Sequence, residues 1–222
     1  MLSAAPRLAR VPPFERGITL GDFLVPIRLG ERLSSRARHI VLVVVGAMFI
    51  ALSANVAVPI PGSPVPVSGQ TFSVLLVGGA LGFRRGAASA LLYLLLGLAL
   101  PVYAQGRSGI EVLGTLEGGR VVLGATGGFL VGFVLASALV GRLAELGWDR
   151  SVIGSLAALA IGNVAIYLVG LPWLAVAADF GAQETLQKGL FPFLVGDAFK
   201  LVVAAALLPA GWWIVNRRPS DR

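Results

Sequence analysis

Long apolar runs, separated by short polar or glycine-rich stretches, make up the chain from residue 40 onward. An α-helix needs roughly 20 apolar residues to cross a bilayer, and several runs approach that length. The runs do not show the alternation of apolar and polar positions that marks a membrane β-barrel. The pattern therefore predicts an all-α membrane protein, a bundle of six transmembrane helices. We expect the spans at about residues 40–58, 70–83, 86–100, 121–146, 152–178 and 190–215.

Three connections between the expected spans have distinct compositions. Residues 59–69 contain four prolines and no charge, so this segment should be extended and either simply joins two spans or lies over a cavity as a lid. Residues 101–120 are rich in glycine and carry both acids and bases, which suits a ligand-contacting loop but equally suits a flexible connector. Residues 179–188 form the last expected outer loop.

The composition places the chain in a membrane. Hydrophobic residues make up 56% of it and charged residues 13%, with a mean hydropathy of +0.85. A soluble domain of this size could not bury so much apolar side chain. The absence of cysteine excludes disulfides and a cysteine nucleophile, and a single histidine disfavours a zinc centre. We therefore predict no metal site, no cofactor and no enzymatic activity.

The first 38 residues are polar, turn-rich and carry seven arginines. They do not resemble a secretory signal, because the first long apolar run begins only at Ile40. Residues 17–33 could form a short helix on the membrane surface, or the arm could be a disordered cytoplasmic tail. The predicted organisation is an arginine-rich arm over 1–38, a transmembrane substrate-binding domain over 39–216 and a cytoplasmic tail over 217–222.

The positions of the basic residues predict the orientation of the bundle. With the amino terminus in the cytoplasm, 14 of the 18 lysines and arginines lie inside, whereas Arg107, Arg120 and Lys188 lie outside. Cytoplasmic loops of membrane proteins carry an excess of lysine and arginine, so we expect both termini in the cytoplasm. The net charge of +7 then follows from the topology, and no nucleic-acid partner is needed to explain it.

An acid and a base lie inside the last expected span. Asp197 and Lys200 are three residues apart, which puts their side chains on one face of a helix. A charge at the bilayer centre costs roughly 2.5 to 3.5 kcal/mol, and such residues tend to pair, face the bundle interior and mark a substrate or ion pathway. We expect this pair to meet a ligand beneath an outer vestibule. The alternative is a salt bridge that only orients the helix.

Weaker signals come from polar and small residues in other spans. Asn163 and Tyr167 are one helical turn apart, and as buried polar groups they need partners, either on another helix or on a ligand. Gln70 opens a short span, and the ends of short spans often border binding sites. Ala47 and Ala51 form a strip of small side chains that another helix can approach closely.

Four blocks of the sequence carry a family resemblance. In chain order they read PVPVSGQTFSVLLVGGALGFRRGAASALLYLLLGLALPVYAQG, GATGGFLVGF, IYLVGLPWL and FPFLVGDAFK. In this order and with this spacing they resemble the BioY family, the biotin-binding S-components of energy-coupling factor (ECF) transporters. The resemblance implies a multi-pass subunit of the bacterial cell membrane that captures biotin from outside. It also implies a coupling module of one transmembrane subunit and two ATPase subunits.

The resemblance assigns roles to individual residues. The implied biotin contacts are Asp197, Lys200, Tyr167, Gln70 and Arg107. Asn163 is a further candidate, because its amide could donate to the ureido ring of biotin. Ala47 and Ala51 are the implied contact with the coupling subunit. Two departures from the family pattern stand out. Ala125 replaces a proline of the GPTGG block, and the segment between Arg107 and Thr126 is long, so either Arg107 or Arg120 is the arginine nearest the ligand.

Two transport functions follow from these residues. The first is biotin binding. The ureido ring of biotin needs a hydrogen-bond acceptor, its apolar rings and chain need apolar walls, and its carboxylate needs a cation. The second is a self-sufficient carrier driven by protons or sodium, with Asp197 and Lys200 as its relay. The sequence lacks the nucleotide motif G-x-x-x-x-G-K-[ST], so ATP-driven transport would need another chain to hydrolyse ATP.

Overall fold

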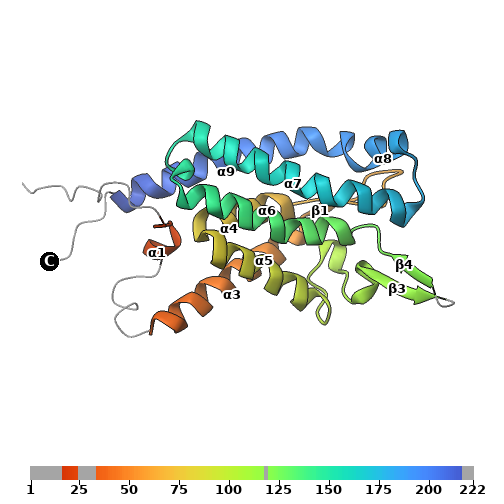
Figure 1. Cartoon of the computed structure of the whole chain (residues 1–222), viewed down its shortest axis with the longest axis horizontal. Coiled ribbons are helices and arrows are strands. Elements are labelled where there is room, and N and C mark those ends of the chain that lie inside the picture. Colours follow the sequence, from red (N-terminus) through yellow and green to blue (C-terminus); the bar gives the residue numbers. More distant parts are fainter. Residues whose placement is uncertain (1–16, 25–33, 118–119, 217–222) are drawn as a thin grey trace, which may run out of the picture.

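The computed structural model describes residues 17–24, 34–117 and 120–216, and in this part the chain is mostly helical (Figure 1). Helices occur at all six positions where spans were expected. They are α3 (Ser35–Ala54), α4 (Gln70–Leu81), α5 (Phe83–Gly97), α6 (Gly127–Glu145), α7 (Val152–Ala178) and α9 (Phe191–Asn216). Two shorter helices are α1 (Gly21–Leu24) and α8 (Ala182–Gly189). The predictions for residues 1–16, 25–33 and 217–222 lie outside the described residues.

Within the described residues, four helices are long and apolar enough to cross a membrane: α3, α6, α7 and α9. Helix α4 has 12 residues and α5 has 15. At about 1.5 Å per residue, both are shorter than the roughly 30 Å hydrocarbon core of a bilayer. Non-helical backbone at membrane depth is tolerated where it lines a cavity, and the segments before α4 and after α5 line the cavity described below.

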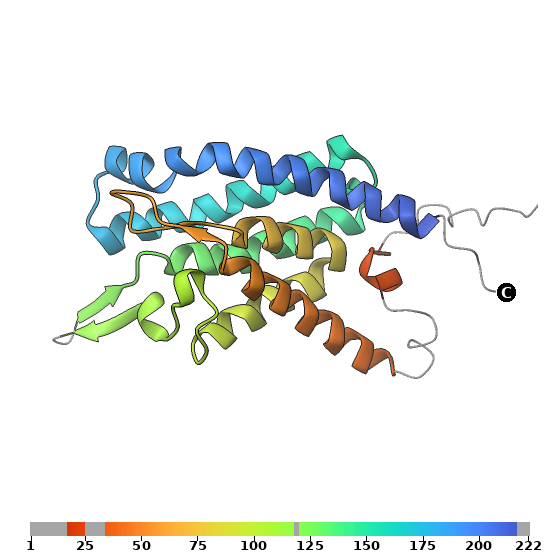
Figure 2. The same ribbon diagram turned by 180° about the vertical axis from the view of Figure 1, so that it is seen from behind.

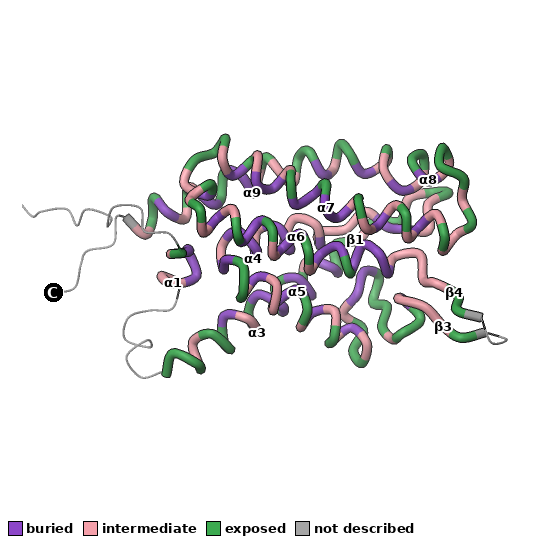
Figure 3. Tube along the Cα trace, in the orientation of Figure 1, coloured by how far each residue is buried: buried purple, intermediate pink, exposed green. Residues whose placement is uncertain are grey.

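The helices form an elongated bundle with α6 at its centre (Figures 1 and 2). Helix α6 packs against α4, α5 and α7, while α9 packs against α7 and α4, and α3 packs against α5 and α4. Buried positions gather along α4 and α6, and exposed positions along the outer sides of α3, α7 and α9 (Figure 3). We call the end with α1 and the last turns of α9 the terminal end. The opposite end, with α8 and the strands, is the loop end (Figure 1).

Glycines let the central helices approach closely. A Cβ atom at Gly78 of α4 would lie 2.6 Å from the carbonyl oxygen of Ser137 in α6, and one at Gly141 would lie 2.4 Å from the backbone of Gly82. Gly82 alone joins α4 to α5 and has a φ of 83°, a conformation that only glycine adopts without strain. The short α4–α5 hairpin therefore sits tightly against α6.

The loop end contains β-structure that the all-α prediction left out. Strands β1 (Ala57–Val58) and β2 (Val67–Ser68) pair antiparallel and close the proline-rich segment into an extended loop, as expected for residues 59–66. Strands β3 (Gly114–Glu117) and β4 (Arg120–Leu123) form a second antiparallel pair.

Several predicted boundaries are wrong. The fourth helix begins at Gly127, not near residue 121, because 120–123 are in β4. The expected loop 179–188 contains most of α8, and the two arginines at 84 and 85 lie inside the first turn of α5.

Residues 17–24, which we call the clasp, pack onto the terminal end. Thr19 and Leu20 are buried, and the Leu20 side chain covers Gly211 of α9. Arg85 of α5 donates to Asp22 Oδ1 at 2.9 Å and to Thr19 Oγ1 at 2.8 Å. The clasp thereby contacts α4, α5, α6 and α9, so this part of the arm is neither a surface helix nor a free tail.

Ala47 and Ala51 do not face outward. Their side chains are 0% and 7% exposed, on the face of α3 that packs against the bundle. A partner could contact them only if they left the bundle interior, so internal packing explains their small size. From residue 40 onward, the exposed side chains of α3 are large and apolar: Ile40, Val41, Val44, Val45, Met48, Phe49 and Leu52.

Candidate functional site

A cavity of about 640 Å³, counted with its open side, lies at the loop end of the bundle. Its walls are mostly apolar side chains of α6, α7 and α9, among them Phe129, Phe133, Ile166 and Phe193. The proline-rich loop contributes Val65 and Pro66, and the loop after α5 contributes Tyr103, Ala104 and Arg107. Apolar walls with a few polar groups are typical of a small-molecule site.

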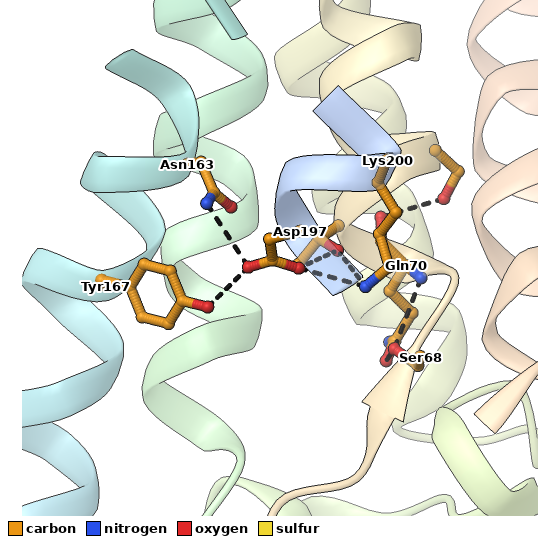
Figure 4. A network of polar contacts seen from close by, with 8 residues as sticks. Ser68, Gln70, Asn163, Tyr167, Asp197 and Lys200 are labelled. Atoms are coloured by element: carbon orange, nitrogen blue, oxygen red, sulfur yellow. Dashed lines mark hydrogen bonds and ion pairs between the residues drawn. The ribbon is translucent and has the colours of Figure 1, made fainter. Parts of the chain in front are cut away.

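The carboxylate of Asp197 is the centre of a polar network on the cavity wall (Figure 4). Its Oδ2 atom accepts a hydrogen bond from the Tyr167 hydroxyl at 2.5 Å and a longer one from Asn163 Nδ2 at 3.4 Å. Its Oδ1 atom accepts from Lys200 Nζ at 3.1 Å. Helices α7 and α9 thus converge on one buried carboxylate, which is 3% exposed. The predicted i, i+3 pairing of Asp197 with Lys200 is confirmed.

Lys200 also contacts α4. Its Nζ atom donates to the hydroxyl of Thr71 at 3.0 Å, and Thr71 in turn lies 3.4 Å from Asp197 Oδ1. An ammonium group has three N–H donors, and two are used by these contacts within the described residues. Because Lys200 lines the cavity, its third donor is available to a ligand. The sequence analysis did not include Thr71 among the site residues. Its position beside Gln70, at the start of a short span, was the feature that could have indicated it.

Gln70 lines the cavity, but its amide is already engaged by the protein. Its Oε1 atom accepts from the Ser68 hydroxyl at 2.8 Å, and its Nε2 atom donates to the Tyr93 hydroxyl at 2.5 Å. Figure 4 shows Gln70 and Ser68 beside the Asp197 network. Gln70 thus joins the loop before α4 to α5.

Asn163 lies behind Asp197, not on the wall of the main cavity. It borders a smaller space of about 180 Å³ together with Thr71, Asp197 and Lys200. Its Oδ1 atom is buried and has no hydrogen-bond partner among the described residues. The structure therefore brings Asp197, Lys200, Tyr167, Gln70 and Arg107 to the main cavity and places Asn163 in the layer behind them.

The two candidate arginines differ in position. Arg107 is exposed and lines the cavity at its open side, in a tight turn where Gln105 has a φ of 64° and Gly106 a φ of 68°. Arg120 lies in β4, and its side chain is outside what the structure describes.

Trp173 supports the turn that holds Ala125, the residue that departs from the family pattern. Its Nε1 atom donates to the carbonyl of Gly124 at 2.9 Å.

The fold and cavity define a helical membrane protein whose bundle encloses a cavity at one end. The fold is similar to that of a crystal structure described as the S-component for biotin from an ECF-type ABC transporter. The TM-score is 0.71 at 23% identity, covering 84% of this chain and 100% of that chain.

The BioY family model matches residues 29–217, and the chain belongs to the BioY family. It is 34% identical over 169 residues to the biotin transporter BioY of Rhizobium etli, covering 72% of this chain and 85% of that protein. It is 35% identical over 167 residues to the biotin transporter BioY of Thermotoga maritima, covering 75% of this chain and 86% of that protein. These matches confirm the family resemblance seen in the sequence blocks.

Proposed function

We propose that this chain is the biotin-binding subunit of a vitamin uptake system and that biotin occupies the cavity at the loop end. The observation that carries the proposal is the Asp197 network, a buried carboxylate with four donors around it on the wall of an otherwise apolar cavity. The names of the relatives and of the similar structure supply the ligand. The alternative raised by the sequence, a salt bridge that only orients a helix, does not account for the cavity.

The exposure of the charged groups suggests how biotin lies in the cavity. The buried Asp197 carboxylate can accept from a ureido N–H in place of one of its two long contacts, from Thr71 or Asn163 at 3.4 Å, and the remaining donor of Lys200 can reach the ureido carbonyl. The bicyclic ring and the chain would then pass along Phe129, Tyr167 and Phe193. Arg107, at the open side, would pair with the biotin carboxylate, because an exposed guanidinium binds a carboxylate without first losing a buried partner.

The membrane arrangement that fits this function has six crossings with both termini in the cytoplasm. The described parts of the chain near its two ends lie together at the terminal end, which agrees with an even number of crossings (Figure 1). The distribution of lysines and arginines places that end inside the cell. The cavity then opens outward, in the cell membrane of a bacterium.

We also propose that uptake is coupled to ATP hydrolysis by other chains, a transmembrane coupling subunit and two ATPase subunits. The proposal follows from family membership and from the lack of a nucleotide motif in this sequence. Uptake of biotin in cells should require co-expression of such a module. Uptake in cells without any coupling ATPase, abolished by a protonophore, would instead identify an ion-coupled carrier.

Calorimetric titration of the detergent-solubilised protein with biotin, lipoate and thiamine tests the ligand. We expect tight binding of biotin alone, and a loss of affinity of more than tenfold in Asp197→Asn and in Lys200→Ala. The matched control is the exposed pair of α8, in which Lys188 Nζ lies 2.7 Å from Glu184 Oε1. Glu184→Gln and Lys188→Ala should bind biotin like the wild type. Wild-type affinity in both Asp197→Asn and Lys200→Ala would remove the pair from the site.

A second binding experiment tests the orientation of biotin in the cavity. Arg107→Ala should weaken the binding of biotin by about tenfold and leave the binding of biotin methyl ester nearly unchanged, because the ester lacks the negative charge. Equal losses for both ligands would contradict a carboxylate at the open side of the cavity.

A further inference from the structure

A buried tyrosine outside the cavity links the two loops that cover it. Tyr93 of α5 is 1% exposed and is not part of the cavity wall. Its hydroxyl donates to the carbonyl of Val102 at 3.2 Å and accepts from Gln70 Nε2 at 2.5 Å. A phenol hydroxyl donates one hydrogen bond and accepts at the same oxygen, so the Tyr93 hydroxyl is used both as a donor and as an acceptor.

The bonds continue on both sides of Tyr93. On one side, Gln70 accepts from Ser68, which ends the proline-rich loop 57–69. On the other side, Val102 begins the loop that carries Tyr103 and Arg107 to the cavity. A single chain of hydrogen bonds therefore runs from the proline-rich loop through Gln70 and Tyr93 to the loop after α5.

Packing keeps Tyr93 in this place. Its ring meets the ring of Tyr103 edge to face, with centroids 5.7 Å apart. The Tyr103 hydroxyl donates back to the carbonyl of Leu94 at 2.6 Å, and the amide of Gly109 donates to the carbonyl of Gly97 at 2.9 Å. The loop after α5 is thus fixed to its own helix, and the Tyr93 hydroxyl extends that attachment to α4 and the proline-rich loop.

We propose that Tyr93 is a positioning residue for ligand binding, which acts through Gln70 to hold both loops over the cavity and so slows the escape of the ligand. The identity of the ligand rests on the proposed function, whereas the arrangement of the loops does not. Gln70 accordingly contributes to binding mainly by fixing these loops, since its amide oxygen and one of its N–H groups are committed to the protein.

The kinetic test uses Tyr93→Phe, which removes the hydroxyl and keeps the ring. We expect biotin to dissociate about tenfold faster, with an association rate within about twofold of the wild type. Gln70→Leu removes the same hydrogen bond from the other side, so biotin should dissociate from the double variant no faster than from either single variant. Ser89→Ala is the control, because Ser89 is another buried hydroxyl of α5 and donates to the carbonyl of Arg85 at 2.8 Å, within its own helix.

A measurement without ligand tests the loops directly. The chain has no cysteine, so Pro61→Cys and Ser108→Cys introduce one exposed label position in each loop. Pulsed electron paramagnetic resonance should give a narrow distance distribution in this background and a broad one when Tyr93→Phe or Gln70→Leu is added. If the distribution stays narrow and biotin leaves at the wild-type rate in both variants, the proposal is wrong. If the distance distribution broadens in the variants but the wild-type protein binds no biotin, Tyr93 still positions the loops and the proposed ligand is wrong.

Discussion

The two ends of the bundle both pair carboxylates with cations, but the pairs have different surroundings. At the loop end, Asp197 is surrounded by a lysine of its own helix and by three neutral donors from two other helices, next to a cavity. At the terminal end, Asp22 meets Arg85, whose guanidinium also bonds Thr19 and the carbonyl of Leu81. The guanidinium of Arg85 thus holds the clasp to the bundle, whereas the ammonium of Lys200 lines the cavity.

A second carboxylate at the terminal end extends the contrast. Asp149 is 1% exposed and accepts from Trp212 Nε1 at 2.6 Å. The guanidinium of Arg150 lies over the Trp212 ring, 3.4 Å from its centroid, and Phe23 of the clasp meets the same ring edge to face. These charges are enclosed by aromatic packing and not by a cavity wall. The comparison suits charge pairs that stabilise the fold at the terminal end and, under the proposed function, a pair that meets the ligand at the loop end.

The strongest test of this division is Arg85→Ala. Removing the cation takes from Asp22 its charged partner, although the two bonds from Thr19 remain, and losing a hydrogen bond to a charged group in this partly buried pair costs about 1.5 to 3 kcal/mol. We expect a clear fall in the thermal midpoint of the purified protein and no change in its biotin affinity beyond about twofold. Arg142→Ala is the control, since Arg142 is 62% exposed in its pair with Glu145 and should cost less than about 1 kcal/mol. A large loss of biotin affinity in Arg85→Ala would break the comparison.

The next test is the pH dependence that Asp149 imposes. Burial raises the pKa of Asp149 to about 6 from 3.8, against the opposing effects of Trp212 and Arg150. Between these values the folded chain holds a proton that the unfolded chain has lost, so stability falls as the pH rises from about 4 to about 6 and is level above that. The thermal stability of the wild type relative to Asp149→Asn should therefore fall by on the order of 2 kcal/mol over this range. A difference that is independent of pH would show that Asp149 titrates normally.

The smallest expected effect sharpens the comparison at the loop end. Tyr167→Phe removes one donor to Asp197 and keeps the ring that lies edge to face against Phe129. We expect biotin affinity to fall about three- to tenfold, which corresponds to the net contribution of one ordinary hydrogen bond, about 0.6 to 1.4 kcal/mol, while the thermal midpoint hardly moves. A midpoint that falls as far as in Arg85→Ala would mean that the Asp197 network is mainly structural.

The sequence predicts the helices of this bundle well, because long apolar runs have few alternatives in a membrane. The end of the 152–178 span agrees with α7 to the residue. The pair β3–β4 was missed, although the Gly-Gly dipeptide between its strands is a hairpin signal. That signal is weak inside a loop that is rich in glycine throughout.

Contacts between distant residues could be predicted only in part. The spacing of Asp197 and Lys200 shows that they share a helix face, and a charge pair in a membrane points to a site. Nothing in the spacing shows which face of α3 carries Ala47 and Ala51, because a small-residue strip serves internal and external packing equally. The links from Gln70 to Tyr93 and from Asp22 to Arg85 span 23 and 63 residues, and only the folded chain brings these groups together.

The clasp lies before residue 29, where the match to the family begins. A protein trimmed to the family boundary would lose Asp22, the carboxylate that balances Arg85, and would uncover Gly211 and the ring of Trp212. Helix α9 carries these uncovered residues at one end and Asp197 and Lys200 at the other. The choice of starting residue for expression, and any tag fused there, is therefore a choice about the integrity of a helix that lines the cavity.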